Sequence, residues 1–440
     1  MGRQSNGPAR RPLFHLPYDG HVNVKKILQI SVRSQRGAEF AATPSTPDSG
    51  GTTSSRQAEA MPAMDELAKR PVAPMPSVPP KVKGTRPPNE IDFWRGFALV
   101  TIFVNHIPGI YFETFTYRNF GFSDSAELFV LLAGWSLRAM VDRSRDLEPL
   151  RLVFRIGGRA VVLYIAQQVI TVIAVAMIAA TALLAQTNLV LQWNNAAAVF
   201  DEPVTANIGL VILTHHLGYF DILPLYIVLM TVAPAIAILH RYTPGVLLAL
   251  SCAVYAATLY TGFNLPTWPV EGRWFFNPFA WQLVFVIGYV LGGDGRPQRL
   301  IKKHRTGLRF LGISFVIGSF FAAVWGWYPD WLSAPDPAAF FVVDKTFQTP
   351  LRLLHVLALV AAFGGAFLYL ARWAKPLVRY FSMLGRNSLN VFCVGSLLSL
   401  AGQIARFTFE GNLSVDVAVL LIGLIGLSVT AWVSEWRQRL

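Results

Sequence analysis

Residues 91–106 read IDFWRGFALVTIFVNH, an apolar run that carries one arginine, Arg95, and one histidine, His106. The run opens the first segment of the chain that is hydrophobic enough to enter a bilayer. Ionisable side chains are costly in such a segment, so by default they mark a functional site. A rise of 1.5 Å per residue places the two residues roughly 16 Å apart along a helix axis. A cation near one membrane face and an imidazole deeper inside indicate chemistry conducted across a membrane.

The composition of the whole chain is typical of a polytopic membrane protein. Of its 440 residues, 53% are hydrophobic and 14% are charged, whereas soluble proteins average about 25% charged residues. The net charge of +13 comes mostly from the N-terminal tail and from alternate loops. This distribution favours membrane orientation and argues against nucleic-acid binding. Both cysteines lie in apolar runs, which predicts neither a disulfide nor a metal site.

The chain divides into two predicted regions. Residues 1–88 are rich in Pro, Ser, Gly and Arg and lack a long apolar stretch, so we expect a disordered tail. Residues 89–440 are expected to form an all-α transmembrane domain of about ten helices, because apolar runs of about membrane length alternate there with short polar links. The predicted spans are 91–112, 124–141, 158–185, 222–240, 244–263, 277–293, 307–327, 351–371, 384–405 and 413–434. A partial helix is expected near 204–213.

The charges of the loops predict the orientation. If the tail is cytoplasmic, nineteen Lys and Arg residues fall on the cytoplasmic side and at most five on the other side. This asymmetry follows the positive-inside rule for ten spans with both termini in the cytoplasm. Arg95 would then lie near the cytoplasmic face and His106 toward the exterior.

Candidate catalytic residues surround His106. Asp124 and Glu127 are one helical turn apart and can both face the first helix, where a carboxylate would hold the imidazole in one tautomer and keep it basic. The same residues also fit a structural role, in which Ser123 or Asp124 caps a helix and His106 bonds a neighbouring carbonyl. Both interpretations remain open at this level.

A cationic ridge is expected at the cytoplasmic end of the third span. Arg151, Arg155 and Arg159 recur every four residues, and guanidinium groups bind phosphates with two parallel hydrogen bonds. Ordinary contacts of positive-inside residues with lipid headgroups are the alternative explanation.

Several motifs resemble the type-3 membrane acyltransferases. They are the pair Arg95 and His106, the segment ELFVLLAGW at 127–135, and the stretch containing Arg155 and Arg159. Within that superfamily, NFGFSDSAELFV at 119–130 and FSMLGRNSLNVFC at 381–393 are similar to the OpgC family, which is associated with succinylation of osmoregulated periplasmic glucans. Many superfamily members have a histidine where this chain has Gly395.

This resemblance implies an acyl-CoA co-substrate, possibly succinyl-CoA, and a glucan or other glycan acceptor outside the bacterial inner membrane. Arg95, Arg155 and Arg159 would hold the phosphates of CoA, and His106, oriented by Asp124 or Glu127, would deprotonate the acceptor hydroxyl. Polar and aromatic residues on the exterior side are the candidates for binding the acceptor: Asn105, Arg118, Asn119, Trp193 and Asn194. No metal is expected, including at the adjacent His215 and His216.

Two other functions fit the same features. A transporter or flippase of a glycan or lipid-linked substrate would also bury ionisable groups among ten spans, although the two halves show no similarly interrupted helices. A non-catalytic membrane scaffold is the third possibility. Membrane lipids surround the protein in all three cases, and the sequence leaves the oligomeric state open.

Overall fold

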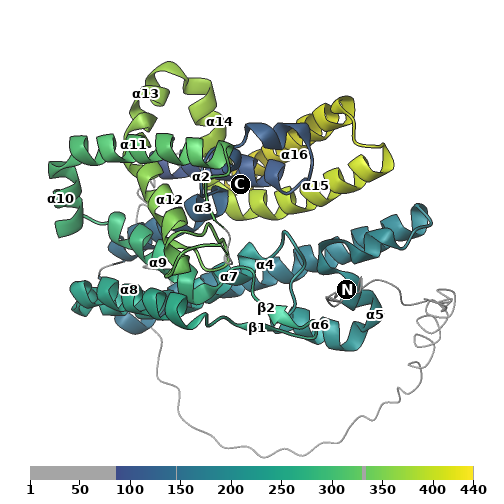
Figure 1. The fold of residues 1–440 in the computed structure, drawn as a ribbon, viewed down its shortest axis with the longest axis horizontal. Helices are drawn as coiled ribbons and strands as arrows, with labels where there is room; N and C mark the ends of the chain where they lie inside the picture. The colour runs from purple at the N-terminus through teal and green to yellow at the C-terminus, as the bar shows by residue number, and fades with distance from the viewer. Residues whose placement is uncertain (1–85, 145, 330–332, 440) are drawn as a thin grey trace, which may run out of the picture. The chain divides into compact units, whose positions relative to one another are not determined.

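The computed structural model describes residues 86–144, 146–329 and 333–439, which form a helical protein (Figure 1). Within this part of the chain the only strands are β1 (Pro266–Thr267) and β2 (Gly272–Arg273), which pair antiparallel. The helices in chain order are α2 (Glu90–Asn105), η2 (Tyr111–Phe115), η3 (Tyr117–Phe120), α3 (Ser125–Asp142), α4 (Pro149–Leu184), η4 (Leu189–Asn195), α5 (Ala197–Asp201), α6 (Pro203–Val211), α7 (Ile222–Tyr242), α8 (Pro244–Thr261), α9 (Pro278–Leu291), α10 (Arg296–Lys303), α11 (Arg305–Val324), η5 (Ala338–Phe340), α12 (Pro350–Phe363), α13 (Ala366–Trp373), α14 (Lys375–Arg386), α15 (Ser388–Thr408) and α16 (Leu413–Arg439).

Helices form at each of the ten predicted ranges, but they are not all long and apolar enough to cross a membrane. Six helices in the described part of the chain meet that requirement: α4, α7, α8, α11, α15 and α16. The pair α12 and α13, bent by 50°, makes a seventh if it is one span. The remaining three, α2, α3 and α9, have 16, 18 and 14 residues. The helical class is therefore confirmed, while ten spans and two cytoplasmic termini stay predictions.

The first predicted span, 91–112, is shorter than expected. Its helix ends at Asn105, and the amide of His106 makes the last helical hydrogen bonds. Pro108 has no N–H to continue the ladder, and Gly109 adopts a φ of +73°, so the chain turns there. The expected partial helix appears as α6. The predicted disordered tail lies outside the described residues except for 86–88.

Close backbone contacts fix the two helices that carry the candidate site. At Gly96 on α2, an added Cβ would lie 1.9 Å from the carbonyl oxygen of Phe381 on α14. At Gly288 on α9, it would lie 2.0 Å from the carbonyl oxygen of Leu131 on α3. Small residues allow such backbone approach between membrane helices. α2 and α3 are thus held against α14 and α9, and they also pack against each other.

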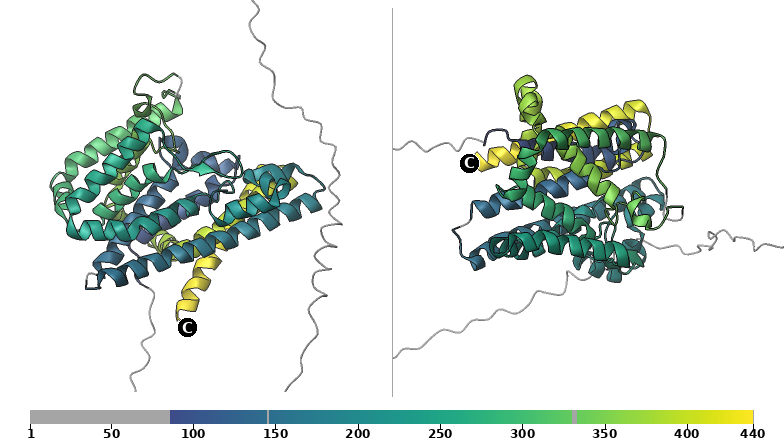
Figure 2. Two further views of the ribbon diagram at one scale, coloured as in Figure 1. Left: turned by 90° about the horizontal axis from the view of Figure 1, so that it is seen from below. Right: turned by 60° about the vertical axis from the view of Figure 1, so that its left-hand side comes forward.

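The C-terminal helices complete the surroundings of α2. α15 and α16 run side by side (Figure 1), and α15 packs against α2. The C-terminal end of α16 extends beyond its neighbours in both views of Figure 2. The hydrogen bond from Arg406 Nη1 to the carbonyl oxygen of Pro108 (3.0 Å) places the C-terminal end of α15 beside the residues that follow α2.

Candidate functional site

His106 is fixed through its backbone, and its ring makes no hydrogen bond to any residue that the structure describes. Its carbonyl oxygen accepts a hydrogen bond of 2.6 Å from Nε2 of Gln403 on α15. The ring lies 5.1 Å from the ring of Tyr219, measured between centroids. Nδ1 is buried and has no hydrogen-bond partner among the described residues, although the residue as a whole is partly exposed. A positioned imidazole without a bound partner is available to take a proton.

Asn194 and Trp193, two of the predicted acceptor-binding residues, hold a loop against α15. Nδ2 of Asn194 donates to Oε1 of Gln403 (3.2 Å), and the ring of Trp193 packs edge-on against Phe407 with 5.1 Å between centroids. Asn194 has a φ of +53°, a conformation that costs free energy in a residue with a side chain. The loop therefore reaches the backbone of His106 through Gln403.

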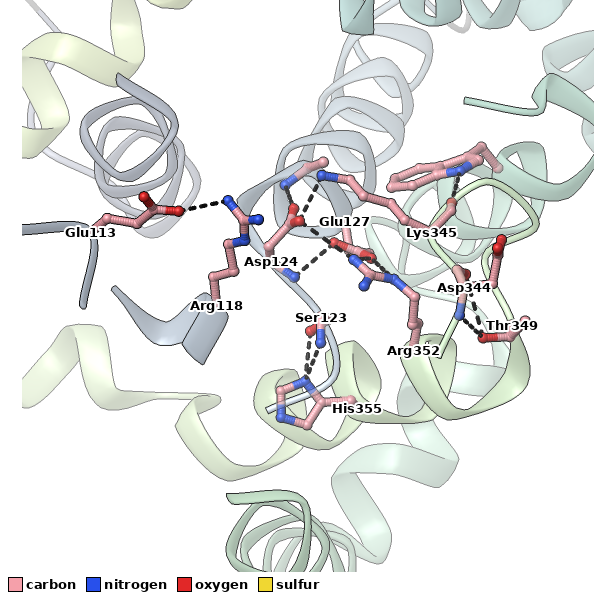
Figure 3. A network of polar contacts seen from close by, with 12 residues as sticks. Glu113, Arg118, Ser123, Asp124, Glu127, Asp344, Lys345, Thr349, Arg352 and His355 are labelled. Carbon is pink, nitrogen blue, oxygen red and sulfur yellow. Dashed lines mark hydrogen bonds and ion pairs between the residues drawn. The ribbon is translucent and has the colours of Figure 1, made fainter. Parts of the chain in front are cut away.

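The predicted contact of His106 with Asp124 or Glu127 is not formed. Both carboxylates instead belong to a buried network with two cations from the loop before α12 and from α12 itself (Figure 3). Lys345 Nζ lies 2.6 Å from Oδ2 of Asp124. Arg352 donates from Nε to Oε1 of Glu127 at 2.8 Å, and its Nη2 lies 3.5 Å from Oδ2 of Asp124. No hydrogen bond joins either carboxylate to His106 in the part of the chain that the structure describes.

Asp124 has the helix-capping role that the sequence left as an alternative. Its Oδ1 accepts from the amide of Ala126 (2.8 Å), and its own amide donates to Oε2 of Glu127 (2.9 Å). The two residues form a capping box at the N-terminus of α3. The network still acts on the imidazole over a distance, since the charges of Lys345 and Asp124 both interact electrostatically with His106.

A second histidine lies beside this network. Nδ1 of His355 on α12 accepts a hydrogen bond from the amide of Ser123 (3.1 Å) and lies 2.7 Å from its Oγ (Figure 3). An Nδ1 that accepts from an N–H group carries no proton, so the ring is neutral with its proton on Nε2. Nε2 is buried without a hydrogen-bond partner within the described residues.

Sequence reasoning missed the roles of Lys345, Arg352 and His355. Arg352 and His355 are three residues apart at the start of an apolar run. They satisfy the same criterion, an ionisable residue in an apolar segment, that singled out Arg95 and His106. Their partners are more than two hundred residues away in the chain, and one sequence does not show that pairing.

The three predicted phosphate-binding arginines are only partly brought together. Arg95 is directed at α3, where it donates to the carbonyl oxygen of Leu132 (3.3 Å) and to the hydroxyl of Ser136. Arg159 on α4 is close enough to repel it electrostatically. Arg155 and Arg159 are exposed, and neither makes a hydrogen bond or ion pair with any described residue. Arg151, by contrast, pairs with Glu148 at 3.8 Å.

The polar residues around the end of α2 differ in exposure. Asn105 is buried, and its Oδ1 has no hydrogen-bond partner in the described ranges. Arg118 and Asn119 are exposed, and both bond to Glu113: Arg118 Nη1 lies 2.9 Å from its Oε1, and Asn119 Nδ2 donates to its carbonyl oxygen (2.7 Å). Glu113 thus orders the segment that carries them.

The adjacent histidines of the loop before α7 are buried. Nε2 of His216 donates to the carbonyl oxygen of Leu213 (2.9 Å), and its ring packs edge-on against Trp274. Burial lowers the pKa of His216 to about 4 and raises the pKa of the nearby Asp221 to about 6, partly offset there by Lys345. Among the described residues, no group of three or more His, Cys, Asp or Glu side chains is placed to hold a metal ion. The absence of a metal stays a prediction.

Comparison with known proteins gives one family. Residues 88–439 match the model of the family described as OpgC protein. No curated protein and no solved structure matches the chain.

Proposed function

Since the chain belongs to the OpgC protein family, whose model spans residues 88–439, we propose that it is an integral-membrane O-acyltransferase of the bacterial inner membrane. Membership in this family implies an acyltransferase acting on glucans, and the apolar helices fit a membrane protein. The donor in this proposal is acyl-CoA, with succinyl or a similar acyl group. The acceptor is a hydroxyl of a periplasmic glucan or another extracytoplasmic glycan.

The single observation that carries the mechanism is the state of His106. Its backbone is held by Gln403, and its Nδ1 has no hydrogen-bond partner among the described residues. As general base, the imidazole takes the proton of the acceptor hydroxyl while the oxygen attacks the thioester carbonyl carbon. The carbon–sulfur bond then breaks, the electron pair leaves with the CoA sulfur, and the imidazolium returns the proton to that thiolate.

The network of Asp124, Glu127, Lys345 and Arg352 supports this step from a distance. Because it contains two carboxylates and two cations, its charges balance. It fixes the N-terminus of α3, where Asp124 interacts electrostatically with His106 without forming a hydrogen bond to it. We assign Asp124 and Glu127 a positioning role through α3.

The donor is proposed to enter from the end of α2 that carries Arg95. Arg155 and Arg159 are exposed cations without partners in the described part of the chain, as phosphate ligands must be before the donor binds. Arg95 lies near Arg159 and roughly 16 Å from His106 along the helix, a distance that the pantetheine arm of CoA spans.

The test is acyl transfer by the purified protein in detergent, with succinyl-CoA and glucan oligosaccharides, followed by mass spectrometry of the glucan. We expect His106→Ala to lower the rate at least a hundredfold, since a positioned general base contributes about 10²- to 10⁴-fold. His304→Ala, at an exposed position between α10 and α11, is the matched control and should keep the wild-type rate. Transfer by His106→Ala at a near-normal rate would refute the assignment of the base, and glycan translocation without any acylation would favour a transporter.

A further inference from the structure

A groove of about 450 Å³ opens between the segment that follows α2 and the loop that joins α15 to α16. This volume lies in the range of small-ligand sites. The residues that line the groove are Gly109, Ile110, Tyr111, Glu113, Thr114, Asn119, Arg406, Gly411, Leu413 and Asp416. Among these lining residues, Asn119 is a predicted acceptor-binding residue, and the other nine have no role in the proposed function.

Arg406 forms a fixed floor for the groove. Its Nε lies 2.9 Å from Oδ1 of Asp416, whose Oδ2 accepts from the amide of Tyr111 (2.8 Å). The guanidinium lies near two glycines with positive φ, Gly109 (+73°) and Gly411 (+31°). A Cβ at Gly411 would be 3.0 Å from Nη2 of the arginine. A side chain at this position would therefore press on the guanidinium, which glycine avoids.

The chemistry of the groove fits an uncharged, hydroxyl-rich ligand. Its two carboxylates are paired, Asp416 with Arg406 and Glu113 with Arg118. Arg406 is the one cation among the described lining residues, and because it is paired it offers little attraction to the phosphates of a CoA. Tyr111 is 51% exposed at the rim and offers an aromatic face. Asn119 uses its Nδ2 within the chain, which leaves its amide oxygen to accept from a hydroxyl. An aromatic face beside amide, hydroxyl and carboxylate groups suits a sugar ring.

The groove is joined directly to the proposed base. Two side chains in the last turns of α15 donate to carbonyl oxygens just after α2: Gln403 to that of His106 and Arg406 to that of Pro108. Gly109 then begins the groove wall. A ligand in the groove therefore lies at the same end of α2 as His106, on the side that the loop charges predict to be exterior.

We propose that this groove is the acceptor subsite and holds a short segment of a neutral glucan chain, with Tyr111 against a sugar ring and Asn119 accepting from a sugar hydroxyl. This proposal rests on the proposed acyltransferase function, and it adds the place and the residues of acceptor binding. The Arg406–Asp416 pair shapes the floor and is a positioning element.

The experiment compares Tyr111→Ala and Asn119→Ala with Tyr260→Ala, an exposed tyrosine (93%) at the end of α8 and outside the groove. We expect the two groove variants to raise the KM for glucan oligosaccharides about tenfold and about fivefold, sizes that match one lost aromatic contact and one lost hydrogen bond. The KM for acyl-CoA and the kcat at saturating glucan should stay within about twofold of wild type. Tyr260→Ala should match wild type in all three quantities.

Direct binding of a fluorescent glucan oligosaccharide to the detergent-purified protein separates the two proposals. If the wild type binds it, Tyr111→Ala weakens that binding, and no acyl group is transferred, the groove is a glucan site and the proposed function is wrong. If the wild type acylates glucan and both groove variants keep its glucan KM, the groove proposal is overturned while the function stands. A rise confined to the acyl-CoA KM would also overturn it.

Discussion

Removing Arg352 should destabilise the protein more than any other single change in the buried network. Arg352 supplies both cationic contacts of Glu127, from Nε at 2.8 Å and from Nη2 at 2.5 Å, and Glu127 is fully buried. In Arg352→Met, the carboxylate keeps only the amide of Asp124 as a donor. Breaking a buried ion pair by removing one partner costs about 3–5 kcal/mol, and we expect a loss of this size in the free energy of unfolding.

Lys345→Met is the matched comparison. Its partner Asp124 keeps the amide of Ala126 and the guanidinium of Arg352 at 3.5 Å. The lysine side chain is 27% exposed, so water replaces part of the contact. We expect this variant to lose about 2 kcal/mol, the scale of one hydrogen bond to a charged group.

The measurement is unfolding of each purified variant in detergent micelles, titrated with denaturant and followed by tryptophan fluorescence. The double variant Glu127→Gln with Arg352→Met removes the unpaired buried charge, so it should recover at least about 2 kcal/mol relative to Arg352→Met alone. The single variant Glu127→Gln is measured as well. If its loss and that of Arg352→Met simply add in the double variant, or if Lys345→Met is less stable than Arg352→Met, Arg352 does not have the predicted role.

Three further predictions concern the donor, the loop before α7 and the helix contacts. Arg155→Gln or Arg159→Gln should raise the KM for acyl-CoA about tenfold without changing the KM for glucan. Steady-state kinetics check this, with Arg151→Gln as a control that should keep the wild-type KM for acyl-CoA. A rise in the KM for glucan alone would contradict the prediction. His216 has a folded pKa below its unfolded value near 6.5, so its contribution to stability is complete above that pH and is lost as the pH falls toward 4. From pH 7.5 to 5.0 the wild type should lose about 2 kcal/mol in the free energy of unfolding through this residue. Thermal melting at both pH values checks this, since in His216→Gln the drop in the free energy of unfolding should be smaller by that amount. Gly288→Ala should lower the melting temperature because its Cβ would overlap the backbone of α3. Gly318→Ala is the control and should keep the wild-type melting temperature, since a Cβ there meets nothing within 4 Å. Equal melting temperatures for the two variants would argue against the close approach of α9 and α3.

The positions of the helices could be predicted from the sequence because an apolar run is a local signal. Each predicted span has its helix, and deviations occur where a backbone effect overrides hydropathy. The run 91–112 stays apolar beyond His106, yet Pro108 and the positive φ of Gly109 end the helix early. Likewise the run 351–371 is bent where Gly365 has a φ of +90° and Arg305 donates to the carbonyl oxygen of Gly364.

The candidate site was less predictable because its contacts join distant parts of the chain. Spacing correctly put Asp124 and Glu127 at one turn of a helix, but spacing does not reveal which cation reaches them. Glu127 and Arg352 are 225 residues apart, and Gln403 and the carbonyl of His106 are 297 apart. The carboxylates therefore pair with α12 and the loop before it, although the sequence suggested His106 as their partner.

The amide of Gln403 is directional, and this has a consequence for motion at the site. Its oxygen accepts from Asn194 and its nitrogen donates to the carbonyl of His106, so turning the amide around would oppose like groups at both ends. Because one side chain makes both bonds in one orientation, the η4 loop and the end of α2 are tied to the same point of α15. A movement of the η4 loop that displaced Asn194 would therefore also displace Gln403 and the carbonyl group of His106. Movement of the η4 loop and displacement of the His106 imidazole are then coupled through Gln403.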